Sequence, residues 1–205
     1  ICMALKRLYV PRARFDDVVD GLSEVMDRQV VGDGLKDGVT MGPLTTARQK
    51  GVVSEMLAEA DAAGADIRYL GKVDDEGDFE AGYFLRPSLV VNADPDLSVV
   101  RDEQFGPTLP VIPYDSEDEA IAMANATDYG LSSSVWSVEE SRAVALAERL
   151  EAGFTNINSH GPTAMDGLSP FGGVKQSGIG RNFGFEGIRQ FQEVHSISGA
   201  SGTIF

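Results

Sequence analysis

Apolar positions along the chain follow two different spacings, and each spacing predicts a type of element. Residues 14–30 place apolar side chains, from Phe15 to Met26, at steps of three and four, the repeat of an amphipathic helix. Residues 5–10 instead interleave leucine, tyrosine and valine with charged side chains, which is typical of a strand. The two patterns alternate along most of the chain, so strands and helices are expected to follow one another.

Capping residues help to delimit these elements. The second helix is expected to begin near Thr45 or Thr46 and to end at Gly64, and Ser116 with Glu119 has the spacing of a capping box. Helices between short strands favour βα units, so the predicted fold class is α/β with a largely parallel sheet. The further predicted helices cover residues 45–64, 116–127 and 138–153, and the further predicted strands cover residues 66–71, 83–93, 108–116, 131–137, 153–158 and 191–198.

Three stretches depart from this alternation. Pro87, within the strand predicted over residues 83–93, indicates a sheet edge or a bulge. Residues 72–82 are rich in acidic side chains and predict a solvated loop, because they miss the EF-hand pattern for calcium. Residues 169–184 are rich in glycine and predict a loop.

Composition limits the classes of protein to which the chain can belong. Its 205 residues, 42% apolar and 24% charged, suit one globular domain or one domain with an appendage, and no apolar run is long enough for a membrane span. The net charge of −15 disfavours nucleic acid and anionic lipid as partners. A single cysteine indicates a reducing cytoplasm, and the distant His160 and His195 predict no metal site.

Three features could carry chemistry. Cys2, the only cysteine, is either a buried inert thiol, which is the commoner case, or a nucleophile. Residues 102–107, DEQFGP, form either a plain loop or a site where a carboxylate meets ribose-like hydroxyls and Phe105 offers a flat apolar face. The segment SPFGGVKQSGIGR fits neither the P-loop nor the dinucleotide fingerprint, so it favours a flexible surface loop over a phosphate site.

Taken together and in order, these features resemble the aldehyde dehydrogenase superfamily. The resemblance rests on a cysteine before KRLYV and on GYFLRPSLV, EQFGPTLPV, ANATDYGLSSSVWS, GFTNIN and PFGGVKQSGIGR, from Cys2 to about Ile197. It implies a parallel-sheet catalytic domain over residues 1–187 and an oligomerisation strand and tail over residues 188–205, with the N-terminal cofactor-binding domain absent from this chain. It also implies NAD or NADP as cofactor, a small-molecule aldehyde as substrate and a homo-oligomer formed through the C-terminal strand.

The resemblance implies chemical roles for three residues. Cys2 matches the catalytic nucleophile, whose thiolate forms a thiohemiacetal with the aldehyde. Loss of hydride to the nicotinamide then leaves a thioester, which water cleaves to the carboxylic acid. The backbone N–H of Cys2 matches half of the oxyanion hole. Glu103 matches the residue that binds the ribose on the nicotinamide side, and Phe105 matches the aromatic ring near the nicotinamide.

Other positions match residues around the site. Asn158 matches an asparagine that orders loops there, and Phe171 matches an aromatic residue of the substrate tunnel. His160 lies in a variable stretch that borders the substrate entrance, or that simply faces solvent. Glu193 falls in the strand used between subunits. Asn182 stands where the family often has a glutamate proposed to relay protons, and an amide cannot titrate.

Three functions are compatible with these residues. The leading one is NAD(P)-dependent oxidation of an aldehyde by the full-length enzyme, with the isolated fragment inactive. The second is a coenzyme A-acylating semialdehyde dehydrogenase, in which a thiol takes the acyl group from the same cysteine. The third is an inactive scaffold or interaction domain, because the implied cofactor domain is absent from the chain.

Overall fold

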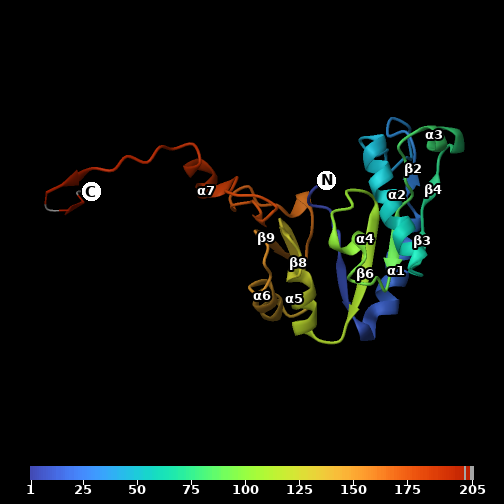
Figure 1. The fold of residues 1–205 in the computed structure, drawn as a ribbon, viewed down its shortest axis with the longest axis horizontal. Coiled ribbons are helices and arrows are strands. Elements are labelled where there is room, and N and C mark those ends of the chain that lie inside the picture. Colours follow the sequence, from blue (N-terminus) through green and yellow to red (C-terminus); the bar gives the residue numbers. More distant parts are fainter. Residues whose placement is uncertain (201, 204–205) are drawn as a thin grey trace. The chain divides into compact units, whose positions relative to one another are not determined.

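A four-stranded sheet organises the first of two compact units, which spans Ile1–Thr127 (Figure 1). The computed structural model describes residues 1–200 and 202–203, and the second unit begins at Asp128. The strands of the sheet, in spatial order, are β1 (Leu8–Pro11), β6 (Thr108–Tyr114), β5 (Ser88–Val91) and β3 (Asp66–Tyr69). Strand β6 is parallel to both of its neighbours, and β3 pairs antiparallel with β5. The predicted α/β fold with a largely parallel sheet is therefore confirmed.

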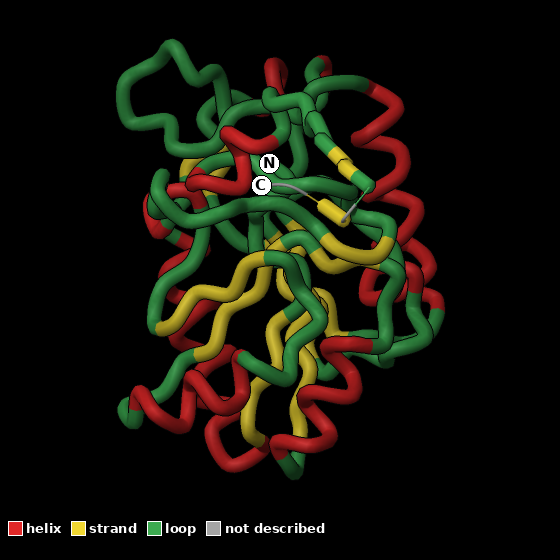
Figure 2. Tube along the Cα trace, turned by 90° about the vertical axis from the view of Figure 1, so that its left-hand side faces the viewer, coloured by secondary structure: helices red, strands yellow, loops and turns green. Residues whose placement is uncertain are grey.

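Helices cover both faces of this sheet. The helices of the first unit are α1 (Phe15–Asp27), α2 (Ala47–Ala62), α3 (Glu76–Ala81), α4 (Ser98–Arg101) and α5 (Glu117–Asn125), with a 3-10 turn η1 (Arg12–Arg14) before α1. Val90 of β5 packs in one apolar cluster with α2 and α4, whereas Leu89 and Val91 pack in another with α1. Because successive side chains of a strand point to opposite faces, α1 lies on one face and α2 with α4 on the other. Figure 2 marks the helices in red and the strands in yellow.

Helix α2 begins and ends at the predicted capping residues. The Thr46 hydroxyl accepts a hydrogen bond from the backbone N–H of Gln49, which satisfies a donor that the helix leaves free. Gly64 follows the last turn with φ +83°, and the N–H of Ala65 bonds back to the carbonyl of Ala60. This geometry is a Schellman motif, which favours glycine at that position.

The N-terminus of α5 corrects the predicted capping box in one detail. The Ser116 hydroxyl accepts from the N–H of Glu119, as expected. The Glu119 carboxylate, however, accepts from the N–H of Asp115 at 2.7 Å and not from that of Ser116. The glutamate thus satisfies the donor one residue before the cap.

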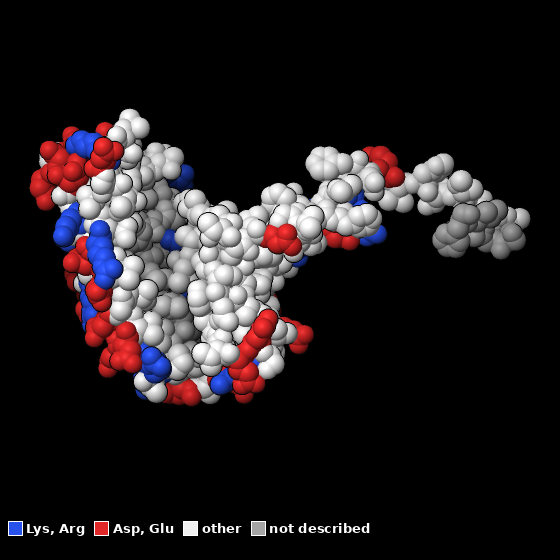
Figure 3. Space-filling view, turned by 180° about the vertical axis from the view of Figure 1, so that it is seen from behind, with Lys and Arg blue, Asp and Glu red and all other residues white. Residues whose placement is uncertain are grey.

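The acidic stretch predicted as a loop over residues 72–82 contains regular structure. Strand β4 (Lys72–Val73) pairs in parallel with β2 (Val30–Val31), and α3 follows. The Asp75 carboxylate caps α3 by accepting from the N–H of Asp78, and this bond lowers the pKa of Asp75. Figure 3 shows acidic side chains gathered at the end of the first unit where α3 lies. The helix is too short for its periodicity to have revealed it.

The interpretation of Pro87 as a sheet edge or bulge is wrong. Strand β5 lies inside the sheet, between β3 and β6, and it begins at Ser88. Pro87 precedes the ladder, where its missing N–H costs no strand hydrogen bond, while its carbonyl accepts from the N–H of Leu70.

The strands of the second unit form short two-stranded sheets. Its elements are β7 (Tyr129–Gly130), β8 (Ser132–Val135), α6 (Glu140–Ala147), β9 (Phe154–Ile157), a 3-10 turn η2 (Pro162–Ala164), β10 (Val174–Lys175), α7 (Gly184–Arg189), β11 (Ser198–Gly199) and β12 (Gly202–Thr203). Strands β8 and β9 run parallel on either side of α6 in the sequence, as predicted for a βα unit. Helix α6 is shorter than the predicted 138–153, and the glycine-rich stretch 169–184 holds β10, which pairs with β7.

The strand predicted over residues 191–198 is not confirmed. Within the described residues, positions 191–197 have no ladder partner, and only Ser198–Gly199 pairs, with Gly202–Thr203. A strand needs a neighbour to satisfy its backbone, and the single chain offers none there. Residues 201, 204 and 205 of the predicted tail lie outside the described residues.

No helix in the described part of the chain is long and apolar enough to span a membrane.

Candidate functional site

The segment that carries the single thiol leads directly into the central sheet. Cys2 is exposed, and the next side chain, Met3, is buried. The N–H of Ala4 bonds to the carbonyl of Ile1, so the cysteine sits in a tight turn a few residues before β1. The turn thus holds the backbone of Cys2 close to the start of β1.

The loop over residues 102–107 presents its side chains alternately outward and inward. Glu103 is exposed, Gln104 is fully buried and Phe105 is 38% exposed. The buried side chain thus lies between two exposed ones. Gly106 follows, and a Cβ atom there would lie 2.7 Å from Val53 of α2, so glycine allows the loop to pack against that helix.

Lys6 and Gln104 connect the cysteine segment to this loop. The Nζ of Lys6 donates to the carbonyl of Gly106 at 2.5 Å. In return, Nε2 of Gln104 donates to the carbonyls of Lys6, at 3.3 Å, and Val99, at 3.0 Å. The structure thus brings Cys2 and Glu103, 101 positions apart in the sequence, into neighbouring segments of one unit.

Two opposing effects act on the lysine of this connection. Burial lowers the pKa of Lys6, and the charge of nearby Glu103 raises it, with burial the larger effect. The lysine is therefore a partly desolvated group beside an exposed carboxylate, a position in which its contacts are less screened than on an open surface.

Asn158 fastens the end of β9 to the segment after β8. It has φ +53°, a conformation that asparagine tolerates better than most residues. Its Oδ1 accepts from the N–H of Ser137 at 2.8 Å and its Nδ2 donates to the carbonyl of Ser137 at 2.9 Å. Both ends of the amide are used, so this side chain orders the two segments.

His160 lies two residues further on, beside the same pair of strands. Its Nδ1 is 3.1 Å from the hydroxyl of Ser134, which also accepts from Nε1 of Trp136 at 3.3 Å. The Ser134 hydroxyl therefore has contacts to both the histidine ring and the indole N–H. Asn158 and His160 therefore both contact residues 134–137, at the C-terminal end of β8.

Phe171 packs at the start of β9. Its ring meets that of Phe154 edge to face, with 5.6 Å between centroids. Its backbone exchanges two hydrogen bonds with Asn182, which closes the glycine-rich stretch into a loop. Gly172 and Gly173 lie where backbones approach closely, since a Cβ at either would come within 2.6 Å of another atom. The glycines thus allow these close contacts within the loop.

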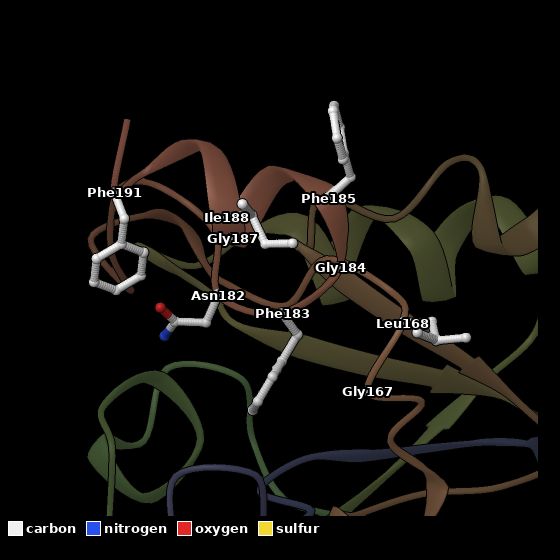
Figure 4. A pocket seen from close by; sticks show the side chains of 9 residues that line it. All are labelled: Gly167, Leu168, Asn182, Phe183, Gly184, Phe185, Gly187, Ile188 and Phe191. Carbon is white, nitrogen blue, oxygen red and sulfur yellow. The ribbon is translucent and has the colours of Figure 1, made fainter. Parts of the chain in front are cut away.

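An open, mostly apolar hollow lies beside Asn182. It has a volume of about 540 Å³, and its lining includes Asn182, Phe183, Phe185 and Ile188 (Figure 4). In Figure 4 the rings of Phe183 and Phe185 point to opposite sides of the chain. No group of three or more His, Cys, Asp or Glu side chains in the described part of the chain is arranged to hold a metal ion.

The comparison with protein families decides the identity of the chain. The model described as "Aldehyde dehydrogenase family" matches residues 1–197. This chain belongs to the aldehyde dehydrogenase family. Among its relatives, the geranial dehydrogenase of Castellaniella defragrans is 34% identical over 196 residues, which cover 96% of this chain and 40% of that protein.

Solved structures of aldehyde dehydrogenases agree in fold. The betaine aldehyde dehydrogenase of Staphylococcus aureus in complex with NAD⁺ matches with a TM-score of 0.85 and 32% identity, over 93% of this chain and 38% of that one. The aldehyde dehydrogenase of Mycobacterium tuberculosis complexed with NAD⁺ matches with a TM-score of 0.85, 33% identity and the same coverage. The chain spans about two fifths of the length of the curated relatives that it matches.

The sequence patterns did not single out two residues, Lys6 and Gln104, that connect the Cys2 segment to the loop of residues 102–107. Lys6 lies in a segment that reads only as the start of a strand, and Gln104 lies in one that reads as a loop. Their contacts join positions about a hundred residues apart, which no local pattern reveals. One clue was available for Gln104, because a polar side chain between Glu103 and Phe105 must face the opposite way from both.

Proposed function

We propose that this chain supplies the nucleophile and part of the cofactor site of an NAD(P)-dependent aldehyde dehydrogenase that converts an aldehyde to a carboxylic acid. The observation that supports the proposal most directly is the connection of the exposed Cys2 segment to the loop of Glu103 and Phe105. The family match and relatives that are complexed with NAD⁺ agree with it.

The residues of this loop fit a dinucleotide. The exposed Glu103 carboxylate can accept hydrogen bonds from ribose hydroxyls, and the partly exposed Phe105 ring can lie against a flat ring. The buried Gln104 between them keeps both side chains on the outer side. When bound, NAD⁺ or NADP⁺ supplies the acceptor for the hydride that leaves the aldehyde carbon.

Cys2 forms and loses the covalent bond to the substrate in this proposal. Its thiolate adds to the aldehyde carbon, and its backbone N–H donates to the oxygen that becomes negative. After the carbon has lost a hydride, the substrate remains as a thioester on the sulfur. Water attacks this thioester, the carbon–sulfur bond breaks, and the acid leaves while the thiolate is restored.

Three residues of the second unit have roles in the same proposal that rest on the family match. Asn158 orders the ends of β8 and β9, and its two hydrogen bonds to Ser137 support that role. Phe171 lines the path of the substrate, supported by its ring packing on Phe154. His160 borders the entrance.

The test uses the complete protein, with NAD(P)H formation followed by absorbance. Cys2→Ser is expected to slow aldehyde oxidation on the order of a thousandfold or more, because an alcohol is a far weaker nucleophile than a thiolate. Ala4→Ser, an exposed change beside it, is the control and should keep near wild-type rates. Oxidation by Cys2→Ser at a rate close to wild type would refute the proposal. Acyl-CoA as the product when coenzyme A is added would instead indicate acyl transfer to a thiol.

The proposal extends to assembly and location. We infer a cytoplasmic homo-oligomer that forms through residues 188–205, with residues 1–187 as the catalytic domain. The exposed apolar side chains of Phe191, Val194 and Ile197 support the assembly, because a single chain leaves them uncovered. Removing residues 188–205 should lower the mass in light scattering to that of a smaller species. An unchanged mass would contradict this role.

A further inference from the structure

We propose that Lys6 and Gln104 are positioning residues for the cofactor: their crossed hydrogen bonds set where Glu103 and Phe105 lie relative to Cys2. We call these bonds the Lys6–Gln104 joint. The inference rests on the proposed function, in which Glu103 and Phe105 contact the dinucleotide and Cys2 is the nucleophile.

Two hydrogen bonds of opposite direction connect the cysteine segment to the loop, and both involve Lys6. The side chain of Lys6 donates into the loop, at the Gly106 carbonyl, and the loop donates back through Gln104 to the Lys6 carbonyl. A second bond from the same Gln104 amide to the Val99 carbonyl anchors it to α4. The loop therefore cannot shift along the cysteine segment without breaking bonds at both of its ends.

The burial of Gln104 requires an explanation, because glutamine is a polar residue. The side chain is fully buried, and its Oε1 has no hydrogen-bond partner among the described residues. An apolar side chain would fill the space without leaving a polar atom unsatisfied. What glutamine adds is the pair of N–H bonds, so its contribution is the tie to Lys6 and Val99.

The joint also sets where the proposed cofactor contacts lie relative to the cysteine segment. Gln104 is held inward, and its two neighbours, Glu103 and Phe105, are exposed. Glu103 is exposed and close enough for its charge to act on Lys6. If the tie were lost, the loop could shift relative to the cysteine segment, and the carboxylate and ring would spend less time in the binding position. The expected effect is therefore on dinucleotide affinity, with much less effect on the reactivity of the thiol.

Lysine at a second site provides a matched control. Nζ of Lys50 donates to the carbonyl of Gly82 at 3.0 Å, which is the same type of bond in the same unit. Lys50→Met removes a lysine-to-carbonyl bond without touching the loop of residues 102–107. Lys6→Met, Lys6→Arg and Gln104→Met complete the set, since arginine can still donate to Gly106 and methionine preserves the length of glutamine without its amide.

Three measurements on the complete protein test the joint. They are the Kd for NAD⁺ by calorimetry, the rate of Cys2 alkylation by iodoacetamide without cofactor, and hydrogen exchange in peptides that cover residues 102–107. Lys6→Met and Gln104→Met should raise the Kd on the order of tenfold, the factor that corresponds to one net hydrogen bond. They should also speed exchange in the loop and change the alkylation rate by less than about twofold.

The variants separate positioning from a general loss of stability. Lys6→Arg should return the Kd to within about threefold of wild type, and Lys50→Met should leave both the Kd and the exchange of the loop unchanged. A wild-type Kd in Lys6→Met, or an equal rise in Lys50→Met, would overturn the inference and leave the proposed function standing. A wild-type protein that does not bind NAD⁺ would overturn the proposed function and the positioning role together. Unchanged loop exchange in Lys6→Met would show by itself that the joint does not hold the loop.

Discussion

Gly153 stands where two backbones of the second unit touch, and Gly153→Ala should destabilise that unit strongly. A Cβ atom on Gly153 would lie 1.7 Å from the carbonyl oxygen of Gly172 and 2.8 Å from its carbon. Ordinary van der Waals contact begins at about 3.4 Å, so the carbonyl would have to retreat by about 1.7 Å. The N–H of Gly153 also bonds to the carbonyl of Gly130, which restricts movement in the other direction.

The size of the effect follows from the kind of atoms that collide. An overpacked side chain can turn to another rotamer, and such changes cost about 1–3 kcal/mol. Here the contact is with backbone, which has no rotamer to change, so we expect the upper end, about 3 kcal/mol. For a unit of the size of Asp128–Phe205 that corresponds to a melting temperature of the unit lower by roughly 12–24 °C.

Thermal melting of the complete protein, followed by circular dichroism, tests this prediction. Gly167→Ala is the matched control, because a Cβ there meets nothing within 4 Å and the backbone is not in the left-handed region. The control should stay within about 0.5 kcal/mol of wild type. Equal melting temperatures for the two variants would refute the steric argument.

Three further changes are expected in the first unit. Gly51→Ala, in the interior of α2 with open space around the new Cβ, should raise the free energy of unfolding by about 0.5–1 kcal/mol in urea titrations; no gain would contradict the propensity argument. Leu89→Ala should lower the free energy of unfolding by about 2–5 kcal/mol, because this fully buried side chain leaves a cavity; a loss below about 1 kcal/mol would count against it. Burial lowers the pKa of Lys6 in the folded protein below 10.5, the value in the unfolded chain. Between these two pKa values the unfolded chain binds more protons than the folded protein, so the free energy of unfolding rises with pH. The contribution of Lys6 to stability is therefore complete above pH 10.5 and is lost as the pH falls through the lowered pKa. Urea titrations at a series of alkaline pH values should therefore show wild type gaining stability relative to Lys6→Met as the pH rises, and parallel curves would contradict this.

The long helices were predictable because their signals are local. The cap at Thr46 and the glycine at Gly64 act within four or five residues of the helix ends. Strand β5 was found, but its limits and its central place were not, since both depend on neighbours distant in the sequence. Helix α3 was missed because a helix of six residues carries no measurable period.

The residues of the candidate site also fall into those that sequence motifs indicate and those that only the structure reveals. Cys2, Glu103 and Phe105 could be named because they lie in motifs that resemble a family, and the family is now established over residues 1–197. Their roles remain predictions. Lys6 and Gln104 could not be named, because a hydrogen bond between positions 6 and 106 leaves no trace in either local sequence.

Gln104 shows why a motif and a mechanism are different statements. The letters EQF give an acidic and an aromatic residue two positions apart, and any buried residue between them would turn both outward. An apolar residue would do so without an unsatisfied carbonyl oxygen. Glutamine therefore gains nothing from burial alone, and its two N–H bonds are what distinguish it. On this argument the outward direction of Glu103 comes from the alternation, while its position relative to Cys2 comes from the bond to the Lys6 carbonyl. The sequence motif indicates only the outward direction of Glu103 and not its position relative to Cys2.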